Sequence, residues 1–269
     1  MRNSMMKKFS FFQESIVFKY MDKKHTFSKH IHDEIYMIGS CLEGNSTFTI
    51  GDKSYEVSKN HLCIIPPNVV HGCVPDDNGD VWKFFTFYPS KKFLQEMANK
   101  MFEEDGDLSF SDYFIDDEEL SLILQETVKK TLESEVVNED EILGFLTLLL
   151  EKYGVFTNGI KPIKPEKFDG LLNYLKHEKY DLKELDFFQM AKIVDMNPYY
   201  FHRVFSKTVG LTPQSFINFL KVSKATDLLE NCESLSLIAQ DSGFYDQPHF
   251  TKQFKKYYGV TPTNYKKLS

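Results

Sequence analysis

The sequence predicts a two-domain protein, in which a β-domain with added helices precedes an all-α domain that holds two helix-turn-helix units joined by a linker helix. Three observations lead to this prediction. Strand-like segments follow one another between residues 16 and 88, helical periods replace them after Pro89, and a segment near the C-terminus repeats itself after 49 residues. The chain has 269 residues, 42% of them hydrophobic, which is enough for two cores. We expect domains at residues 1–155 and 168–269, with a linker at 156–167.

Four segments rich in β-branched and aromatic residues define the strands of the first domain. They are residues 35–38, 46–50, 62–65 and 81–88. Gly44-Asn45 and Gly51-Asp52 are typical of hairpin turns, and Pro66-Pro67 ends a strand because proline cannot donate to a strand ladder. Closely spaced short strands with no helix between them predict a sandwich or a small barrel.

Helices are expected to close the first domain. Apolar residues recur at three- and four-residue steps in residues 93–97, 120–132 and 142–150. The last stripe consists of Ile142, Phe145, Leu146 and Leu149. It is either buried within the domain or part of a two-fold interface between copies, and burial is the more frequent outcome for such stripes.

The connection between the domains separates two regions of opposite charge. Residues 156–167 read FTNGIKPIKPEK, a composition typical of an exposed linker. Residues 1–160 carry 16 Lys and Arg against 27 Asp and Glu, a net −11, whereas residues 161–269 carry 16 against 12, a net +4, so the whole chain has −7. A basic domain behind an acidic one indicates a nucleic-acid surface in the second domain.

An internal repeat is the strongest signal in the second domain. Residues 201–213 (FHRVFSKTVGLTP) match residues 250–262 (FTKQFKKYYGVTP) at a constant offset of 49. The offset is 48 at Ala191 and Ala239, so the second copy has one more residue in its turn, where Gly243 supplies a left-handed conformation. Residues 213–231 have helical spacing and form the predicted linker helix. N-cap signals stand at Asp186, Asn197-Pro198 and Asp246, and C-cap glycines at Gly210 and Gly259.

Two helix-turn-helix units on one chain suit DNA, because their second helices can enter successive major grooves about 34 Å apart. Since the repeated phenylalanines must face the core, the residues between them face outward. The predicted DNA-facing residues are Tyr199, His202, Arg203, Ser206 and Lys207 on the first helix and Gln247, His249, Thr251, Lys252, Lys255 and Lys256 on the second. Arg203, the only arginine besides Arg2, suits guanine, while Lys207, Lys255 and Lys256 suit phosphates. The alternative is a helical scaffold with a merely solvated face.

Residues 170–267 resemble the DNA-binding domain of the AraC/XylS transcriptional regulators. The resemblance rests on YYFHRVFSK-x-x-GLTP in the first unit and on IAQDSGFYDQPHFTKQFKKYYGVTPTNY in the second. It implies bacterial DNA binding in which the residues at positions 199, 202 and 203 lead the reading of bases. Pro248, in the first turn of the second helix, departs from the family pattern and removes a backbone donor there.

A second group of chemically notable residues lies in the first domain, at His30, His32, Glu34, Tyr36, His71 and Trp82. The spacing resembles the two cupin motifs, and HIHDEIYMIG is similar to the sensor domains that precede AraC-type modules, over roughly residues 20–90. This resemblance implies a cupin-like jelly-roll barrel. Three interpretations remain open for these residues: the wall of a ligand pocket, which we favour, structural histidines bound to neighbouring backbone, and, third, metal ligands.

We therefore expect a DNA-binding transcriptional regulator, with activation favoured over repression, whose first domain senses a ligand and dimerises. The expected partners are double-stranded DNA at promoter half-sites, a small-molecule effector, RNA polymerase and a second copy of the chain; no cofactor, no metal and no catalytic residue is predicted. Short apolar runs, the absence of a signal core and four cysteines without CxxC spacing predict a cytoplasmic protein with reduced thiols and no membrane contact. The alternatives are a metal-dependent cupin enzyme with a helical docking module, and a protein-binding adaptor without a ligand.

Overall fold

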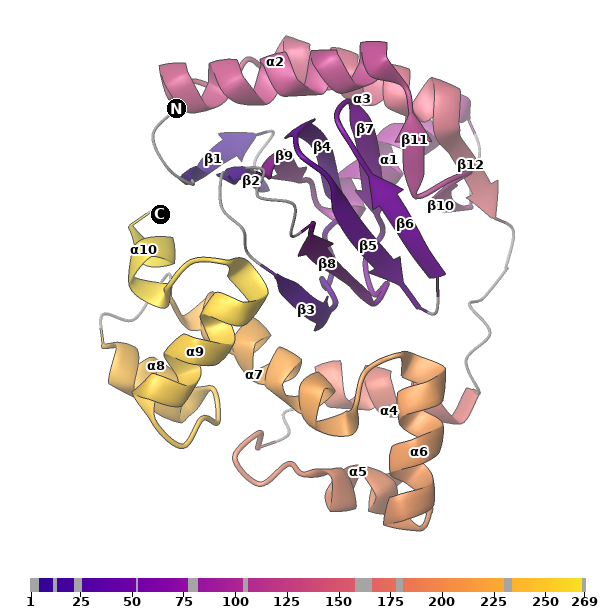
Figure 1. The fold of residues 1–269 in the computed structure, drawn as a ribbon. Coiled ribbons are helices and arrows are strands. Elements are labelled where there is room, and N and C mark those ends of the chain that lie inside the picture. Colours follow the sequence, from indigo (N-terminus) through magenta and orange to yellow (C-terminus); the bar gives the residue numbers. More distant parts are fainter. Residues whose placement is uncertain are drawn as a thin grey trace. The chain divides into compact units, whose positions relative to one another are not determined.

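The computed structural model describes residues 5–11, 14–21, 26–51, 53–76, 82–103, 106–157, 166–177, 181–229 and 234–267. They form two compact units, one built largely from residues 1–160 and the other largely from residues 161–267 (Figure 1). Within the described ranges, no helix combines the length and the apolar composition needed to cross a bilayer. Cys41, Cys63 and Cys73 are buried free thiols, and Cys232 lies outside the described residues.

Three antiparallel sheets contain the described strands (Figure 1). The six-stranded sheet has the order β1 (Met5–Phe11), β2 (Glu14–Met21), β9 (Lys83–Tyr88), β4 (Met37–Glu43), β7 (His61–Ile65) and β11 (Phe114–Asp116). The four-stranded sheet has the order β3 (Phe27–His30), β8 (His71–Pro75), β5 (Ser46–Ile50) and β6 (Lys53–Val57). The third sheet pairs β10 (Asp107–Phe110) with β12 (Gly154–Thr157).

The two larger sheets pack through aromatic side chains. The ring centroid of Phe48 on β5 lies 5.8 Å from that of Phe84 on β9 and 5.5 Å from that of Phe114 on β11. Hydrogen bonding between described strands stays within each sheet, so the predicted closed jelly-roll barrel is not found in this part of the chain. The predicted β-domain with helices is confirmed, but side-chain packing, and not a continuous ladder, joins its sheets.

Several predicted strand features are confirmed and others are corrected. Strands β5 and β7 match the predicted segments, and Gly51, at φ 57°, turns the hairpin between β5 and β6. Gly44, at φ 80°, instead carries the chain from one sheet to the other. Strand β12 includes Phe156 and Thr157, which the sequence assigns to the linker. Residues 158–165 of that linker lie outside the described residues.

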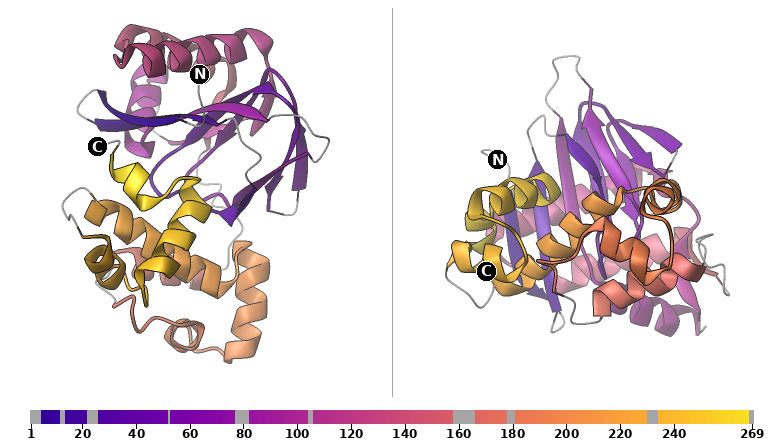
Figure 2. Two further views of the ribbon diagram at one scale, coloured as in Figure 1. Left: turned by 60° about the vertical axis from the view of Figure 1, so that its left-hand side comes forward. Right: turned by 90° about the horizontal axis from the view of Figure 1, so that it is seen from below.

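Helices α2 (Glu118–Ser134) and α3 (Glu139–Tyr153) cover the other face of the six-stranded sheet, and α1 (Lys91–Phe102) adds to the same core (Figure 2). The residues of the predicted apolar stripe, Ile142, Phe145, Leu146 and Leu149, are each at most 1% exposed. They pack with sheet residues such as Ile38 and Phe87 in one cluster. The stripe therefore stabilises the unit internally.

The second unit is helical throughout its described residues after 166. Its helices are α4 (Glu166–His177), α5 (Phe187–Ile193), α6 (Pro198–Val209), α7 (Pro213–Leu229), α8 (Leu235–Asp241), α9 (Gln247–Tyr258) and α10 (Pro262–Lys266). The predicted double helix-turn-helix with its linker helix is confirmed: α5 and α6 form the first copy, α8 and α9 the second, and α7 joins them.

The repeat in the sequence is a repeat in the packing. Phe201 and Phe205 of α6, and Phe250 and Phe254 of α9, are all fully buried. Phe216, at the start of α7, packs on Phe205 with ring centroids 5.8 Å apart. Its counterpart 49 residues later is Tyr265, whose ring lies 5.3 Å from that of Phe254. Each copy thus uses the same aromatic contact to fix the helix that follows its second helix.

Gly39 on β4 is expected to tolerate no side chain, because an added Cβ would meet the ring of Phe84 and lie 2.6 Å from Cγ2 of Thr86. Gly39→Ala should lower the free energy of unfolding by about 1–3 kcal/mol through overpacking. Gly144→Ala on α3 is the matched control, since nothing lies within 4 Å of the new methyl group, and it should raise stability by about 0.5–1 kcal/mol. Urea denaturation of both variants measures the difference, and equal midpoints would contradict the proposed close packing.

Candidate functional site

The first helix-turn-helix copy is held by side-chain caps at both of its helices. The Asp186 carboxylate accepts a hydrogen bond from the backbone N–H of Gln189 at 2.8 Å. The Asn197 side-chain oxygen accepts from the N–H groups of Tyr199 and Tyr200 at 3.0 and 3.3 Å, directly before Pro198 begins α6. These contacts confirm the predicted N-caps and fix where the second helix starts.

The second copy repeats this construction. The Asp246 carboxylate accepts from the backbone N–H of His249 at 2.7 Å and caps α9. Gly210 and Gly259 end α6 and α9 in the left-handed region, at φ 80° and 75°. Gly243, in the turn, has φ 90°, and a Cβ there would lie 2.9 Å from the carbonyl carbon of Leu182. Position 243 therefore requires glycine, both because of its backbone conformation and because a side chain would have no space.

Helix α6 presents a polar and aromatic face. Tyr199 is 78% exposed, and His202, Arg203 and Lys207 are exposed as the sequence predicts. Ser206 differs, because the residue is half-buried and its hydroxyl is covered, with no hydrogen-bond partner among the described residues. This position is next to the buried Phe205, so it lies at the flank of the outward face and not on it.

Tyr200 is a functional candidate that the sequence reasoning missed. Its side chain is 52% exposed, and the guanidinium carbon of Arg203 lies 5.5 Å from the centre of its ring. The two residues are three positions apart on a helix, a spacing that brings side chains together and that could have identified the pair. A cation over a tyrosine ring is attracted to it, so Tyr200 restricts where the Arg203 guanidinium lies.

Helix α9 presents a more basic face. Gln247, His249, Lys252, Lys255 and Lys256 are exposed, and Thr251 is half-buried. The two last lysines lie in the final turn of the helix, near its C-terminus. Tyr245, 97% exposed just before the helix, was not predicted as a site residue. The predicted residues of each copy thus lie on one helix and are exposed, except Thr251 and Ser206, which are half-buried.

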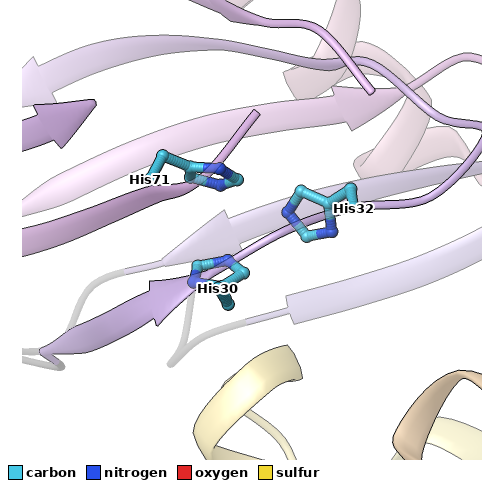
Figure 3. A group of neighbouring side chains, drawn as sticks. All are labelled: His30, His32 and His71. Carbon is cyan, nitrogen blue, oxygen red and sulfur yellow. The ribbon is translucent and has the colours of Figure 1, made fainter. Parts of the chain in front are cut away.

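Three of the predicted pocket residues are histidines that lie on or beside neighbouring strands of the four-stranded sheet. His30 ends β3, His32 follows two residues later, and His71 begins β8, the neighbour of β3 in the four-stranded sheet. One ligand-type nitrogen from each ring lies within 4.8 Å of the others (Figure 3). The ring centroids of His32 and His71 are 5.0 Å apart, and Tyr88 of β9 lies 5.6 Å from His32.

Backbone carbonyls orient two of these imidazoles. His30 Nδ1 lies 2.8 Å from the carbonyl oxygen of Ser28, and His71 Nδ1 lies 2.9 Å from that of Val69. Since a carbonyl oxygen only accepts, both Nδ1 atoms carry the proton and donate it. Burial lowers the pKa of His71 to about 4, against the opposing effect of the Val69 hydrogen bond. The ring of His71 is therefore neutral at neutral pH.

The other predicted pocket residues lie elsewhere. Glu34 is exposed, with a left-handed φ of 54°, and its carbonyl accepts from the backbone of Lys91. Tyr36 is buried in the cluster beneath the helices, where its hydroxyl donates to the carbonyl of Leu108 at 3.2 Å. Trp82 is buried and stacks on Phe84, with ring centroids 5.2 Å apart. The structure thus does not bring Glu34 or Tyr36 together with the histidines.

Lys19 is a buried ionisable residue that the sequence reasoning missed. It is 4% exposed and lies on β2 opposite Thr86, on the face away from the core residues Phe18 and Tyr20. Burial lowers the pKa of its amine to about 7. No local pattern identifies this lysine, because the flanking residues alternate charge and aromatic groups as an exposed terminus would.

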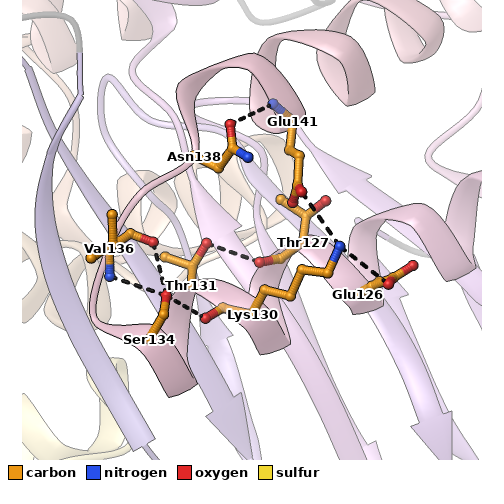
Figure 4. A network of polar contacts seen from close by, with 8 residues as sticks. All are labelled: Glu126, Thr127, Lys130, Thr131, Ser134, Val136, Asn138 and Glu141. Atoms are coloured by element: carbon orange, nitrogen blue, oxygen red, sulfur yellow. Dashed lines mark hydrogen bonds and ion pairs between the residues drawn. The ribbon is translucent and has the colours of Figure 1, made fainter.

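A groove of about 590 Å³ runs between α2 and α3 on the outer side of the first unit. Its floor contains Ile123, Phe145 and Leu148, and Leu148 is 39% exposed. At its edge Lys130 bridges the carboxylates of Glu126 and Glu141 at 3.2 and 3.4 Å (Figure 4). The groove combines apolar surface with a charged rim, which is typical of protein–protein contacts.

Comparison with known proteins assigns both units. A family model described as an AraC-like ligand binding domain matches residues 14–149, and one described as a helix-turn-helix domain matches residues 190–268. Among the relatives, the uncharacterized HTH-type transcriptional regulator YbfI of Bacillus subtilis is 26% identical over 229 residues, 83% of this chain and 81% of that protein. The HTH-type transcriptional activator RhaS of Escherichia fergusonii is 25% identical over 245 residues, 88% of this chain and 86% of that protein.

A solved structure shares the fold over the whole chain. The crystal structure of ToxT from Vibrio cholerae covers 100% of this chain, with 98% of that chain aligned, at a TM-score of 0.54 and 16% identity. At this identity the likeness shows a common fold. It supports the arrangement of an N-terminal β-sheet unit with helices followed by a helical unit.

Proposed function

The chain belongs to the AraC family of helix-turn-helix transcriptional regulators with an N-terminal AraC-like ligand-binding domain, and we propose that it binds promoter half-sites as a homodimer and activates transcription in response to an effector. Members of this family are ligand-responsive DNA-binding regulators and not enzymes, so the metal-dependent enzyme considered above is set aside. Activation is favoured because the RhaS relative carries the name of an activator.

One observation carries the proposal: two copies of the same capped helix pair bury the same phenylalanines and expose polar faces on α6 and α9. On α6, the residues that contact base edges are Tyr199, His202 and Arg203. On α9, the exposed lysines Lys252, Lys255 and Lys256 contact phosphates, which adds affinity without reading the sequence. This division assigns base recognition chiefly to α6.

The first domain controls the second in this proposal. An effector stabilises one of two arrangements of the domains, and only that arrangement presents both second helices to DNA and to RNA polymerase. A homodimer places two such modules on repeated half-sites and raises the effective concentration of the second module once the first is bound.

Selection of genomic DNA fragments by the purified full-length protein tests the proposal. A motif of two half-sites about ten base pairs apart is expected. The isolated helical unit, residues 161–269, is run in parallel and should recover at least one half-site. Failure of the full-length protein to enrich any sequence, at moderate salt and with or without cell extract as an effector source, would refute DNA recognition.

Arg203→Ala and Lys256→Ala should weaken DNA binding in different ways. Loss of the Arg203 fork should cost about 1–3 kcal/mol at one operator position and relax the preference there. Loss of the Lys256 charge should weaken specific and random duplexes alike and reduce the dependence of log K on log salt by about one. Fluorescence anisotropy over a set of single-base operator variants measures both. A uniform loss for Arg203→Ala would contradict its role in base reading.

Tyr200→Ala should relax the preference at the same operator position as Arg203→Ala, by a smaller amount of about 0.5–1 kcal/mol. The reason is that the guanidinium loses the ring that restricts it. Tyr200→Phe keeps the ring and should restore discrimination, because the phenol oxygen is not needed for this contact. If Tyr200→Phe is as defective as Tyr200→Ala, the hydroxyl contacts DNA directly and the positioning role is wrong.

The groove between α2 and α3 is the surface that we assign to the homodimer. Leu148→Glu should weaken dimerisation at least about tenfold, because it places a carboxylate on the apolar floor near Glu126 and Glu141. Val74→Glu is the control, since Val74 is also a half-exposed apolar residue of this unit, 50% exposed on β8. Sedimentation velocity over a concentration series gives the dissociation constants. A monomeric wild type, or equal loss in both variants, would exclude this interface.

A further inference from the structure

We propose that Tyr245 recognises a thymine in the half-site of the second helix-turn-helix copy, through contact of its ring with the thymine methyl group. The inference rests on the proposed function, because it names a base that the DNA-binding unit recognises. It adds a specific contact to a copy whose exposed lysines suit phosphates. Three features of Tyr245 support it: its place in the repeat, its lack of a role in packing, and the fixed backbone on either side.

The turns of the two copies follow the same hydrogen-bond pattern up to the residue before Tyr245. In the first turn, the N–H of Met196 donates to the carbonyl of Ala191 at 2.9 Å. In the second turn, the N–H of Phe244 donates to the carbonyl of Ala239 at 2.8 Å. Both residues of the second pair lie at an offset of 48 from their counterparts. Phe244 is therefore the equivalent of Met196.

Tyr245 is the one residue by which the second copy is longer than the first. The cap that follows Met196 is Asn197, and the cap of α9 is Asp246, at an offset of 49. The offset thus changes between Phe244 and Asp246, where Tyr245 is the only residue. Because the first copy has no equivalent residue, a contact made by Tyr245 belongs to the second copy alone.

Tyr245 has no role in packing the helical unit. An apolar residue directly before an N-cap often packs on the fourth residue of the helix, which here is Phe250. Phe244 takes that place instead, with its ring centroid 5.4 Å from that of Phe250. Tyr245 is 97% exposed, more than any other large apolar residue that the structure describes. Tyrosine is enriched at interfaces, because its ring is apolar and its hydroxyl tolerates water.

The backbone on either side of Tyr245 is fixed. Gly243 has a left-handed φ of 90° and no space for a side chain. Phe244 is 4% exposed, and its ring also lies 5.4 Å from the ring of His249. On the other side, the Asp246 carboxylate accepts from the N–H of His249 at 2.7 Å. A side chain carried by such a backbone loses little conformational freedom when it makes a contact.

The position and the chemistry of the ring indicate thymine. In a helix-turn-helix, the first residues of the second helix contact base edges in the major groove, so the residue directly before the cap of α9 lies at the groove. Thymine presents a methyl group there, which apolar side chains contact. Pro248, the exposed second residue of α9, adds apolar surface at the same end of the helix and offers no N–H. Lys252, Lys255 and Lys256 supply the positive charge that holds DNA on this helix.

Replacement of thymine by deoxyuridine tests the contact, because uracil differs from thymine only by the missing methyl group. The probe is the operator that the full-length protein selects from genomic DNA. Arg203→Ala identifies the half-site of the first copy, by the position at which the preference is relaxed. In the other half-site, each thymine is replaced by deoxyuridine in turn. One replacement should weaken binding by the wild type about fourfold, the effect of one buried methyl group.

Variants at position 245 assign the effect to the ring. Tyr245→Ala should bind the thymine operator about fourfold more weakly than the wild type does, and should bind the deoxyuridine operator equally well. Tyr245→Phe keeps the ring and should retain both the affinity and the preference. Tyr174→Ala is the matched control and should behave as the wild type does, since Tyr174 is a 42% exposed tyrosine on α4, outside both copies. Fluorescence anisotropy with the full-length variants measures all four proteins.

Several results would overturn the contact while the proposed function stands, because they need an operator that the wild type binds. They are an operator without thymine in that half-site, a wild type that does not distinguish thymine from deoxyuridine, and a Tyr245→Ala variant that keeps the preference. A loss in Tyr245→Phe equal to that in Tyr245→Ala on every sequence would indicate a phosphate contact of the hydroxyl and also overturn base recognition. Selection of no operator by the wild type would overturn the proposed function and this inference together.

Discussion

The functional surface of the second unit depends on the burial of two phenylalanine pairs, Phe201 with Phe205 and Phe250 with Phe254. Each pair is one helical turn apart, so it fixes the rotation of its helix about the helix axis. Full burial of each ring contributes about 1.5–3 kcal/mol, more than a surface contact is worth. The outward residues are therefore free to vary while the direction in which they point stays constant. Arg203 and Lys255 point outward because the buried phenylalanines of the same helix fix its opposite face against the core.

The second unit was predictable because its determinants are local. An N-cap aspartate, a proline at the first helical position and a C-cap glycine act within a few residues, and the repeat supplies each signal twice. Ser206 is half-buried, although the sequence places it on the outward face, because a helical face has a flank and spacing alone does not say how far the neighbouring elements cover it. Tyr200 was missed because helical spacing was used to find the core residues and was not applied to pairs of side chains on the surface.

The first unit was less predictable because its strands depend on distant partners. Strand β12 pairs with β10, almost fifty residues earlier. The identity of residues 154–157 does not indicate which strand they pair with. Tyr36 lies in the same core cluster as Ile38, two positions further along, because alternate residues of an extended segment share one face, and the sequence alone does not say which face meets the core. The three histidines were found from their spacing, but only the structure separates them from Glu34 and Tyr36.

Helix α7 has apolar residues on every side, because it serves both copies of the repeat. Phe216 packs into the first copy, while the Thr226 hydroxyl bonds to the Tyr258 hydroxyl and Tyr257 donates to the carbonyl of Ser215, which join α7 to the second. A chain cut after α7 would expose to solvent the apolar side of this helix that packs on the second copy. The smallest module that folds on its own is accordingly the two helix-turn-helix copies together with α7. A truncated or fused gene that keeps a single copy would produce a protein with an exposed, aggregation-prone helix, and not one with half of the activity.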